Sequence, residues 1–213
     1  MRLSNSKKFL LLYSTFTNFA LILHQKMTYI DDQIQQMDLA AALAAVSPER
    51  REYALRYRHE LGQRQCVAAY LLLQRALRQE YGIEGHLQFA IGEHGKPSLV
   101  GHPDIHFNLS HCREAVACAV SDRPVGVDIE SIHRYHPMLL DYTMNPDERR
   151  QVTQAARPAE AFIGLWTMKE AVLKLTGEGI SRDLHNVLTD HCYTFHTTIH
   201  PTYICTTASE SAD

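Results

Sequence analysis

The sequence lacks most of the features that mark extracellular, nucleic-acid-binding and membrane-spanning proteins. Its five cysteines are an odd number with no Cys-x-x-Cys pair, which argues against a disulfide framework and favours a reducing compartment. The formal net charge of −3 provides no overall basic field for nucleic acid, so a site for a polyanion must be a local cluster. The chain has no stretch of about 20 predominantly apolar residues, the length that a spanning helix needs. We therefore expect a cytoplasmic protein that binds neither nucleic acid nor membranes.

The first 26 residues differ in composition from the rest of the chain. Lys7 and Lys8 precede an apolar run at residues 9–13, an arrangement that resembles the start of a signal peptide. Polar residues interrupt the apolar stretch, and no small-residue cleavage site follows it. We interpret residues 1–26 as a non-native or disordered N-terminal extension, and we expect the globular pattern to open at Met27.

From Met27 onward, both halves of the chain show helix signals followed by short apolar strands. Ser47 before Pro48, and Asn145 before Pro146, pair an N-cap residue with a proline in the first helical position, which predicts two helix starts. Apolar spacing and turn residues indicate the other elements. Helices are expected at 38–46, 50–59, 63–81, from 146 and at 158–176, and strands at 87–91, 105–109, 115–120, 125–129, 193–199 and 203–207.

Two of these strands are separated by a single turn. The sequence Ser-Asp-Arg-Pro lies between 115–120 and 125–129, so we predict that the two strands form a hairpin. The order of elements predicts an α+β fold of two lobes packed side by side. The N-terminal lobe is expected at residues 27–104 and the C-terminal lobe at residues 105–213.

Carboxylates and lysines gather in two segments about forty residues apart. In Gly-Val-Asp-Ile-Glu, Asp128 and Glu130 point to the same face, because side chains alternate along a strand. In Trp-Thr-Met-Lys-Glu-Ala-Val-Leu-Lys, Glu170 and Lys174 are neighbours one helical turn apart. If strand and helix pack together, three carboxylates converge beside a lysine, and such hard oxygen ligands suit Mg²⁺. Each segment alone is more typical of a salt-bridged surface, so the interpretation depends on the pair.

Two further segments carry groups that suit phosphate. Lys96 stands on a tight turn in Gly-Lys-Pro, which on its own is typical of a solvated surface lysine. The second segment is His-Phe-Asn-Leu-Ser-His at 106–111, where Ser110 and His111 close a strand. An imidazolium and a hydroxyl at such an end can bind phosphate oxygens.

Taken in order, GKP, HFNLSHC, GVDIE and WTMKEAVLK resemble the signature of 4′-phosphopantetheinyl transferases, over roughly residues 30–205. The chain length is similar to that of the two-lobed, surfactin-synthetase-type class. The resemblance implies two pseudosymmetric lobes with coenzyme A in the cleft between them, and a monomer, because one chain builds the whole cleft. It also implies transfer of the 4′-phosphopantetheine arm of coenzyme A to a serine of an apo acyl or peptidyl carrier protein, with release of adenosine 3′,5′-bisphosphate.

The resemblance also assigns roles to individual residues. Asp128, Glu130 and Glu170 would hold Mg²⁺, with Mn²⁺ as the alternative ion. Lys174 would contact the phosphates, His111 would hold a pyrophosphate oxygen, and Glu170 is also the candidate base for the serine. The residues expected to bind coenzyme A are Arg50, Arg64, Lys96, Pro97, Ser110, His111 and Lys174.

Two functions of other kinds use the same residues. A binding module would hold coenzyme A or a carrier protein without transferring anything. A metal-dependent phosphohydrolase would cleave a nucleotide pyrophosphate without a protein acceptor. Comparing the reaction with and without a carrier protein distinguishes the two enzymes.

Overall fold

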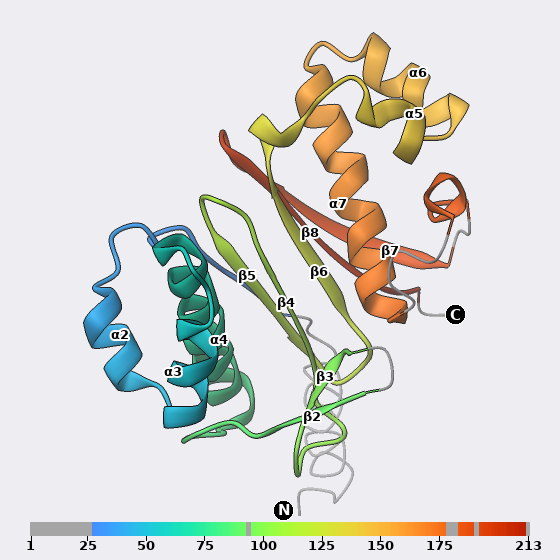
Figure 1. Cartoon of the computed structure of the whole chain (residues 1–213). Helices are drawn as coiled ribbons and strands as arrows, with labels where there is room; N and C mark the ends of the chain where they lie inside the picture. The colour runs from blue at the N-terminus through green and yellow to red at the C-terminus, as the bar shows by residue number, and fades with distance from the viewer. Residues whose placement is uncertain (1–26, 93–94, 178–182, 190–191, 212–213) are drawn as a thin grey trace, which may run out of the picture.

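The computed structural model of the chain describes residues 27–92, 95–177, 183–189 and 192–211 (Figure 1). The extension predicted at residues 1–26 lies outside these ranges. The described residues form a mixed α+β fold with three small antiparallel sheets, which confirms the predicted class. None of the helices in these ranges has the length and apolar character needed to cross a membrane.

The first half of the chain folds around a three-stranded sheet in the order β1-β5-β4. Both strand pairs are antiparallel, and α2, α3 and α4 lie on one side of the sheet (Figure 1). The elements are β1 (Met27–Asp31), α2 (Leu39–Ala45), α3 (Pro48–Leu55), α4 (Glu60–Tyr81), β4 (His106–His111) and β5 (Val116–Ser121).

Local capping explains where α3 begins and where α4 ends. The Ser47 side chain accepts a hydrogen bond from the backbone N–H of Arg50, and Pro48 occupies the first helical position, as predicted. α3 ends at Leu55, four residues before the predicted end, because the chain tightens there into i to i−3 hydrogen bonds and turns into α4. Gly82 ends α4 in the left-handed conformation, with φ of 65°.

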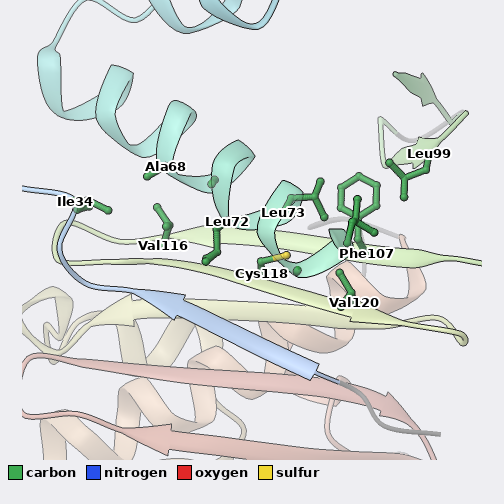
Figure 2. Packing of buried hydrophobic residues seen from close by; sticks show 12 residues of the cluster. Ile34, Ala68, Leu72, Leu73, Leu99, Phe107, Val116, Cys118 and Val120 are labelled. Carbon is green, nitrogen blue, oxygen red and sulfur yellow. The ribbon is translucent and has the colours of Figure 1, made fainter. Parts of the chain in front are cut away.

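The apolar face of α4 packs on β5 and forms the largest part of the core. Leu72 and Leu73 of α4 lie against Val116 and Cys118 of the strand (Figure 2). The other face of β5 is also covered, because Ala117 and Ala119 pack against the second sheet. A strand buried on both faces needs apolar residues at every position, which explains why β5 reads Val-Ala-Cys-Ala-Val.

A short hairpin extends from the first half. β2 (Phe89–Ile91) pairs antiparallel with β3 (Pro97–Leu99), a strand that is not among those predicted from the sequence. Leu99 is buried in the same core as Phe107, which anchors the hairpin to β4.

The second half of the chain folds around another three-stranded sheet, which we call the second sheet. Its strand order, β6-β8-β7, repeats the order β1-β5-β4 of the first. In each sheet the first strand pairs with the third, the third pairs with the second, and a long helix lies between the first and second strands in sequence. α7 packs across β6 and β8 (Figure 1). The elements are β6 (Gly126–Ser131), the 3₁₀ turn η1 (Ile132–Arg134), α5 (Leu139–Thr143), α6 (Pro146–Gln154), α7 (Pro158–Thr176), the 3₁₀ turn η3 (Leu184–Asn186), β7 (Tyr193–Ile199) and β8 (Tyr203–Glu210).

The predicted hairpin of 115–120 with 125–129 is wrong. β5 pairs with β1 and β4, whereas β6 pairs with β8 at the far end of the chain. β6 meets β4 through side chains instead of a backbone ladder. Asn108 Oδ1 accepts a hydrogen bond from Val127 N at 2.9 Å, and Ser110 Oγ accepts one from Ile129 N at 3.3 Å. We call this contact between β4 and β6 the seam.

Gly126, the first residue of β6, allows the strand to approach α7 closely. A Cβ at this position would lie 2.0 Å from the backbone oxygen of Ala171 and 2.6 Å from the backbone nitrogen of Leu175. Both atoms belong to the helix backbone, which cannot move aside as a flexible side chain can. The close packing of β6 on α7 therefore requires glycine here.

Replacing Gly126 with alanine should push β6 away from α7. We expect Gly126→Ala to lower the free energy of unfolding by about 3 kcal/mol, because overpacking a buried site forces the backbone to shift. Gly164→Ala is the matched control, since a Cβ there has no atom within 4 Å and the residue lies inside α7. The free energy of unfolding of the control should rise by about 0.5–1 kcal/mol, because alanine has a higher helix propensity than glycine. Urea denaturation measures both, and equal midpoints for Gly126→Ala and the unmodified protein would contradict the packing argument.

Candidate active site

The structure brings Asp128, Ser110 and Lys174 together from three elements. Lys174 on α7 donates hydrogen bonds from Nζ to Asp128 Oδ1 at 2.6 Å and to Ser110 Oγ at 2.8 Å. The Ser110 hydroxyl also donates to Asp128 Oδ1, at 2.9 Å. β4, β6 and α7 thus each contribute one member, as the predicted packing of strand and helix requires.

One oxygen of Asp128 is left without a partner. Asp128 is 3% exposed, and its Oδ2 is buried with no hydrogen-bond partner among the described residues. A buried carboxylate oxygen that is not paired is costly, because it has lost its hydration. The unpaired oxygen is therefore a natural position for a further donor or cation.

Glu130 and Glu170 share the charge field of Asp128. Burial raises the pKa of Glu130, the charge of Asp128 raises it further, and Arg134 opposes both effects. Burial also raises the pKa of Glu170, again with Asp128 next, while Lys174 opposes the rise. The negative charge of Asp128 therefore disfavours charge on both glutamates, and the positive charges of Arg134 and Lys174 partly offset this repulsion.

The three carboxylates suit a hard cation, although their side chains do not point to one common position. Carboxylate oxygens are the ligands that Mg²⁺ takes from proteins, and an ion here would relieve both the repulsion and the unpaired oxygen. As the side chains stand, no three His, Cys, Asp or Glu residues in the described ranges are arranged to hold a metal ion. Binding a cation would thus require side chains to turn.

His111, at the end of β4, lies in the field of the same group. Burial lowers the pKa of His111, and the charge of Lys174 lowers it further, while Asp128 opposes this. The neutral ring is therefore favoured over the imidazolium that the sequence suggested. A neutral imidazole still has one N–H that can donate to a phosphate oxygen.

Lys96 does not stand free on its turn. Its Nζ donates to the backbone oxygens of Lys174 at 2.7 Å and Leu175 at 3.0 Å. These are carbonyls of the last turn of α7, where a positive charge is favoured by the helix dipole. Lys96 and Pro97 at the start of β3 therefore join the hairpin of the first half to the helix that carries Lys174.

Arg50 lies among aromatic rings. The guanidinium carbon is 4.7 Å from the ring centre of Tyr70, and the rings of Tyr53 and Phe89 are at 5.2 and 5.4 Å. The one hydrogen bond of its guanidinium in the described residues is a long contact with Cys66 Sγ. Stacking leaves the N–H edge of a guanidinium available to a ligand.

Arg64 uses its donors within the protein. Its guanidinium binds the Glu60 carboxylate and the backbone oxygens of Ile34 and Met37. This arginine therefore has fewer donors to offer a ligand than Arg50 has, and its contacts support the fold.

Comparisons with known proteins agree with the motifs. A family model described as the 4′-phosphopantetheinyl transferase superfamily matches residues 124–211. A 4′-phosphopantetheinyl transferase of Bacillus subtilis is 32% identical over 160 residues, which cover 73% of this chain and 71% of the relative. The 4′-phosphopantetheinyl transferase psf-1 of Bacillus pumilus is 35% identical over 158 residues, which cover 73% of this chain and 68% of the relative. The chain belongs to the 4′-phosphopantetheinyl transferase superfamily. The family and the enzyme class predicted from the four motifs are confirmed.

The transferase also contains a buried ion pair that sequence reasoning did not single out. Lys169 is fully buried, and its Nζ donates to Glu148 Oε2 at 2.7 Å and to the backbone oxygen of Leu184 at 2.6 Å. Glu148 also accepts from the Asn145 N–H in a capping box at the start of α6. The pair holds α6 and η3 against the helix that carries Glu170. The only signal in the sequence was a lysine beside a glutamate, which is ordinary on an exposed helix face.

Breaking this pair should destabilise the transferase more than losing a surface pair does. We expect Lys169→Met to cost about 3–5 kcal/mol, because it leaves the Glu148 charge buried and unpaired. The double variant Lys169→Met with Glu148→Leu should recover part of that loss. Arg150→Gln, which removes an exposed pair with Asp147, should cost less than about 0.5 kcal/mol. Urea unfolding of the four proteins tests this, and a loss for Lys169→Met no larger than that of the control would count against it.

Proposed function

We propose that this transferase moves the 4′-phosphopantetheine group of coenzyme A to a serine of an apo acyl or peptidyl carrier protein. The observation that carries the proposal is the group of Asp128, Ser110 and Lys174, with Glu130 and Glu170 in the same charge field. Transfer between phosphate esters needs positive charge at the phosphates and an acceptor held in line. Lys174 and a cation held by the carboxylates would supply the positive charge, neutral His111 would donate a hydrogen bond to a phosphate oxygen, and Glu170 would bind the acceptor hydroxyl.

We propose further that the chain forms two pseudosymmetric lobes and that coenzyme A binds between them. The identical strand order of the two sheets, each with a long helix in the same place, supports a repeated unit. β5 pairs with both β1 and β4, so β4 and β5 belong to the first sheet, and we place the boundary between the lobes within residues 122–125 and not after 104. Because one chain would supply both sides of the site, a monomer suffices.

In this proposal, coenzyme A is held by residues from both sides of the seam. Lys174 has three N–H donors and can turn from Asp128 to a pyrophosphate oxygen. Ser110 and neutral His111 donate to the same phosphates, and Lys96 and Pro97 line the adenosine side. Arg50 is the better candidate for the 3′-phosphate, since the donors of Arg64 are bound within the protein.

The proposed metal ligands are Asp128, Glu130 and Glu170, which would hold Mg²⁺ or Mn²⁺. When bound, the ion would neutralise charge on the pyrophosphate while the bond to the leaving group breaks. Asp128 would present its unpaired Oδ2, and Glu130 would have to turn from Arg134.

Glu170 is the proposed base. It would take the proton from the serine hydroxyl of the carrier, whose oxygen then attacks the phosphorus that bears the pantetheine arm. Adenosine 3′,5′-bisphosphate leaves with its charge held by Lys174. Burial and Asp128 raise the pKa of Glu170 in the metal-free chain, whereas a bound cation would lower it, so the two proposed roles of Glu170 change its basicity in opposite directions.

Replacing Glu170 with glutamine tests the function and the charge argument together. With coenzyme A, Mg²⁺ and an apo carrier, the unmodified protein should add the arm to the carrier, and Glu170→Gln should not, as measured by the mass of the carrier. With metal chelated, the variant should melt about 2 °C higher, because it removes a carboxylate that burial and Asp128 disfavour.

The controls separate this proposal from its alternatives. Glu52→Gln, at an exposed glutamate, should change neither transfer nor Tm. Coenzyme A cleaved without any carrier would indicate a pyrophosphohydrolase, and binding without transfer would indicate a binding module. Full transfer by Glu170→Gln would show that Glu170 is not the base.

The role of Arg50 is tested by a change in substrate as well as in protein. Arg50→Gln should raise KM for coenzyme A about tenfold, since a charge-assisted hydrogen bond is lost, with little change in kcat. KM for dephospho-coenzyme A, which has no 3′-phosphate, should be the same in both proteins. Arg64→Gln should instead lower the melting temperature, because its contacts hold Ile34 and Met37. An unchanged KM for coenzyme A in Arg50→Gln would contradict the assignment.

A further inference from the structure

Arg134 binds one of the three carboxylates of the proposed metal site. Its guanidinium forms an ion pair with Glu130 Oε1, four residues earlier in the chain. The two side chains differ greatly in exposure, because Arg134 is 65% exposed whereas Glu130 is 11% exposed. A largely exposed cation thus reaches in from solvent to a carboxylate that is almost buried.

The turn that carries Arg134 does not depend on this ion pair. η1 is fixed by backbone hydrogen bonds from Ile132 N to Thr202 O at 3.0 Å and from Tyr135 N to Ile132 O at 3.3 Å. The Tyr135 ring packs against Phe162 with centres 5.3 Å apart. The arginine side chain can therefore leave Glu130 while the turn stays in place.

The charge of Arg134 acts on the whole cluster. The pKa of Arg134 is raised first by Glu130 and to a smaller degree by Asp128 and Glu170, so all three carboxylates attract it. Lys174 already neutralises Asp128 through a direct bond. Arg134 therefore supplies, from solvent, positive charge of the kind that a divalent ion would supply from within.

We propose that Arg134 is a competing counter-ion, which holds Glu130 while no divalent ion is bound and must release it when one binds. The ion pair occupies Glu130 Oε1, and the carboxylates do not converge in the described residues as they stand. An ion that binds through Glu130 Oε1 must therefore displace the guanidinium. Arg134 stabilises the metal-free enzyme and raises the concentration of metal that the enzyme needs. This inference rests on the proposed metal site.

The test measures metal binding directly, in the absence of coenzyme A. Mn²⁺ is titrated into the full chain and followed by calorimetry or by its electron paramagnetic resonance signal. Arg134→Gln should bind Mn²⁺ about three- to tenfold more tightly, because a partly exposed ion pair no longer competes. Arg134→Lys keeps the charge, so its affinity for Mn²⁺ should be closer to that of the unmodified protein.

A second readout separates competition from a purely structural role. In chelator, Arg134→Gln should have a lower Tm than the unmodified protein, and saturating Mn²⁺ should raise its Tm by more. A structural role alone would lower Tm under both conditions and would weaken binding. Arg150→Gln removes an arginine about as exposed as Arg134, whose partner Asp147 is itself exposed, and it should change neither quantity.

The outcomes distinguish this inference from the metal site itself. If Mn²⁺ binds the unmodified protein, fails to bind Asp128→Asn, and binds Arg134→Gln no more tightly, the counter-ion role is overturned and the metal site stands. If Mn²⁺ does not bind the unmodified protein at all, the metal site is overturned and this inference with it. Tighter binding by Arg134→Gln together with unchanged binding by Arg150→Gln supports it.

Discussion

The hydrogen bonds among Ser110, Asp128 and Lys174 are the constraint on which the site depends. They join a strand of the first sheet, a strand of the second sheet and the long helix behind it. Each bond involves a charged or buried group, so each is stronger than a surface contact. The residues that are proposed to meet phosphate and metal therefore also hold the two halves of the chain in position. Ser110, Asp128 and Lys174 thus both stabilise the fold and form part of the proposed site.

The positive groups around the carboxylates differ in their exposure to solvent. Lys174 is anchored on α7 and binds Asp128, whereas Arg134 reaches Glu130 from solvent. Lys169, next to Glu170 in sequence, faces the other way and is committed to Glu148. Three cations close in sequence to the carboxylates thus have separate tasks: one lies at the site, one competes for it and one holds the helix behind it.

Local signals in the sequence predicted most of the helices and strands but missed β1, β3 and α5, and they predicted the pairing of the strands poorly. The caps at Ser47, Asn145 and Gly82 depend on neighbouring residues, and strand alternation placed Asp128 and Glu130 on one face. The pairing of β6 with β8 joins residues about eighty positions apart, and no local pattern encodes that choice. The turn between β5 and β6 favoured a hairpin of these two strands, but both edges of β5 are paired, one with β1 and the other with β4. Lys169 was missed for a similar reason, because burial of a lysine is decided by α6 and η3, which lie elsewhere in the chain.

The seam has a consequence for how the two sheets are aligned. Asn108 and Ser110 are two residues apart, as are the N–H groups of Val127 and Ile129 that they bind. A slide of β6 by two residues along β4 would leave one side-chain acceptor empty and one buried N–H unpaired, while the apolar faces would still match. Two polar side chains thus select one alignment among several that hydrophobic packing alone would allow. In that alignment Ser110 reaches Asp128, so the alignment of the sheets and the assembly of the site are specified together.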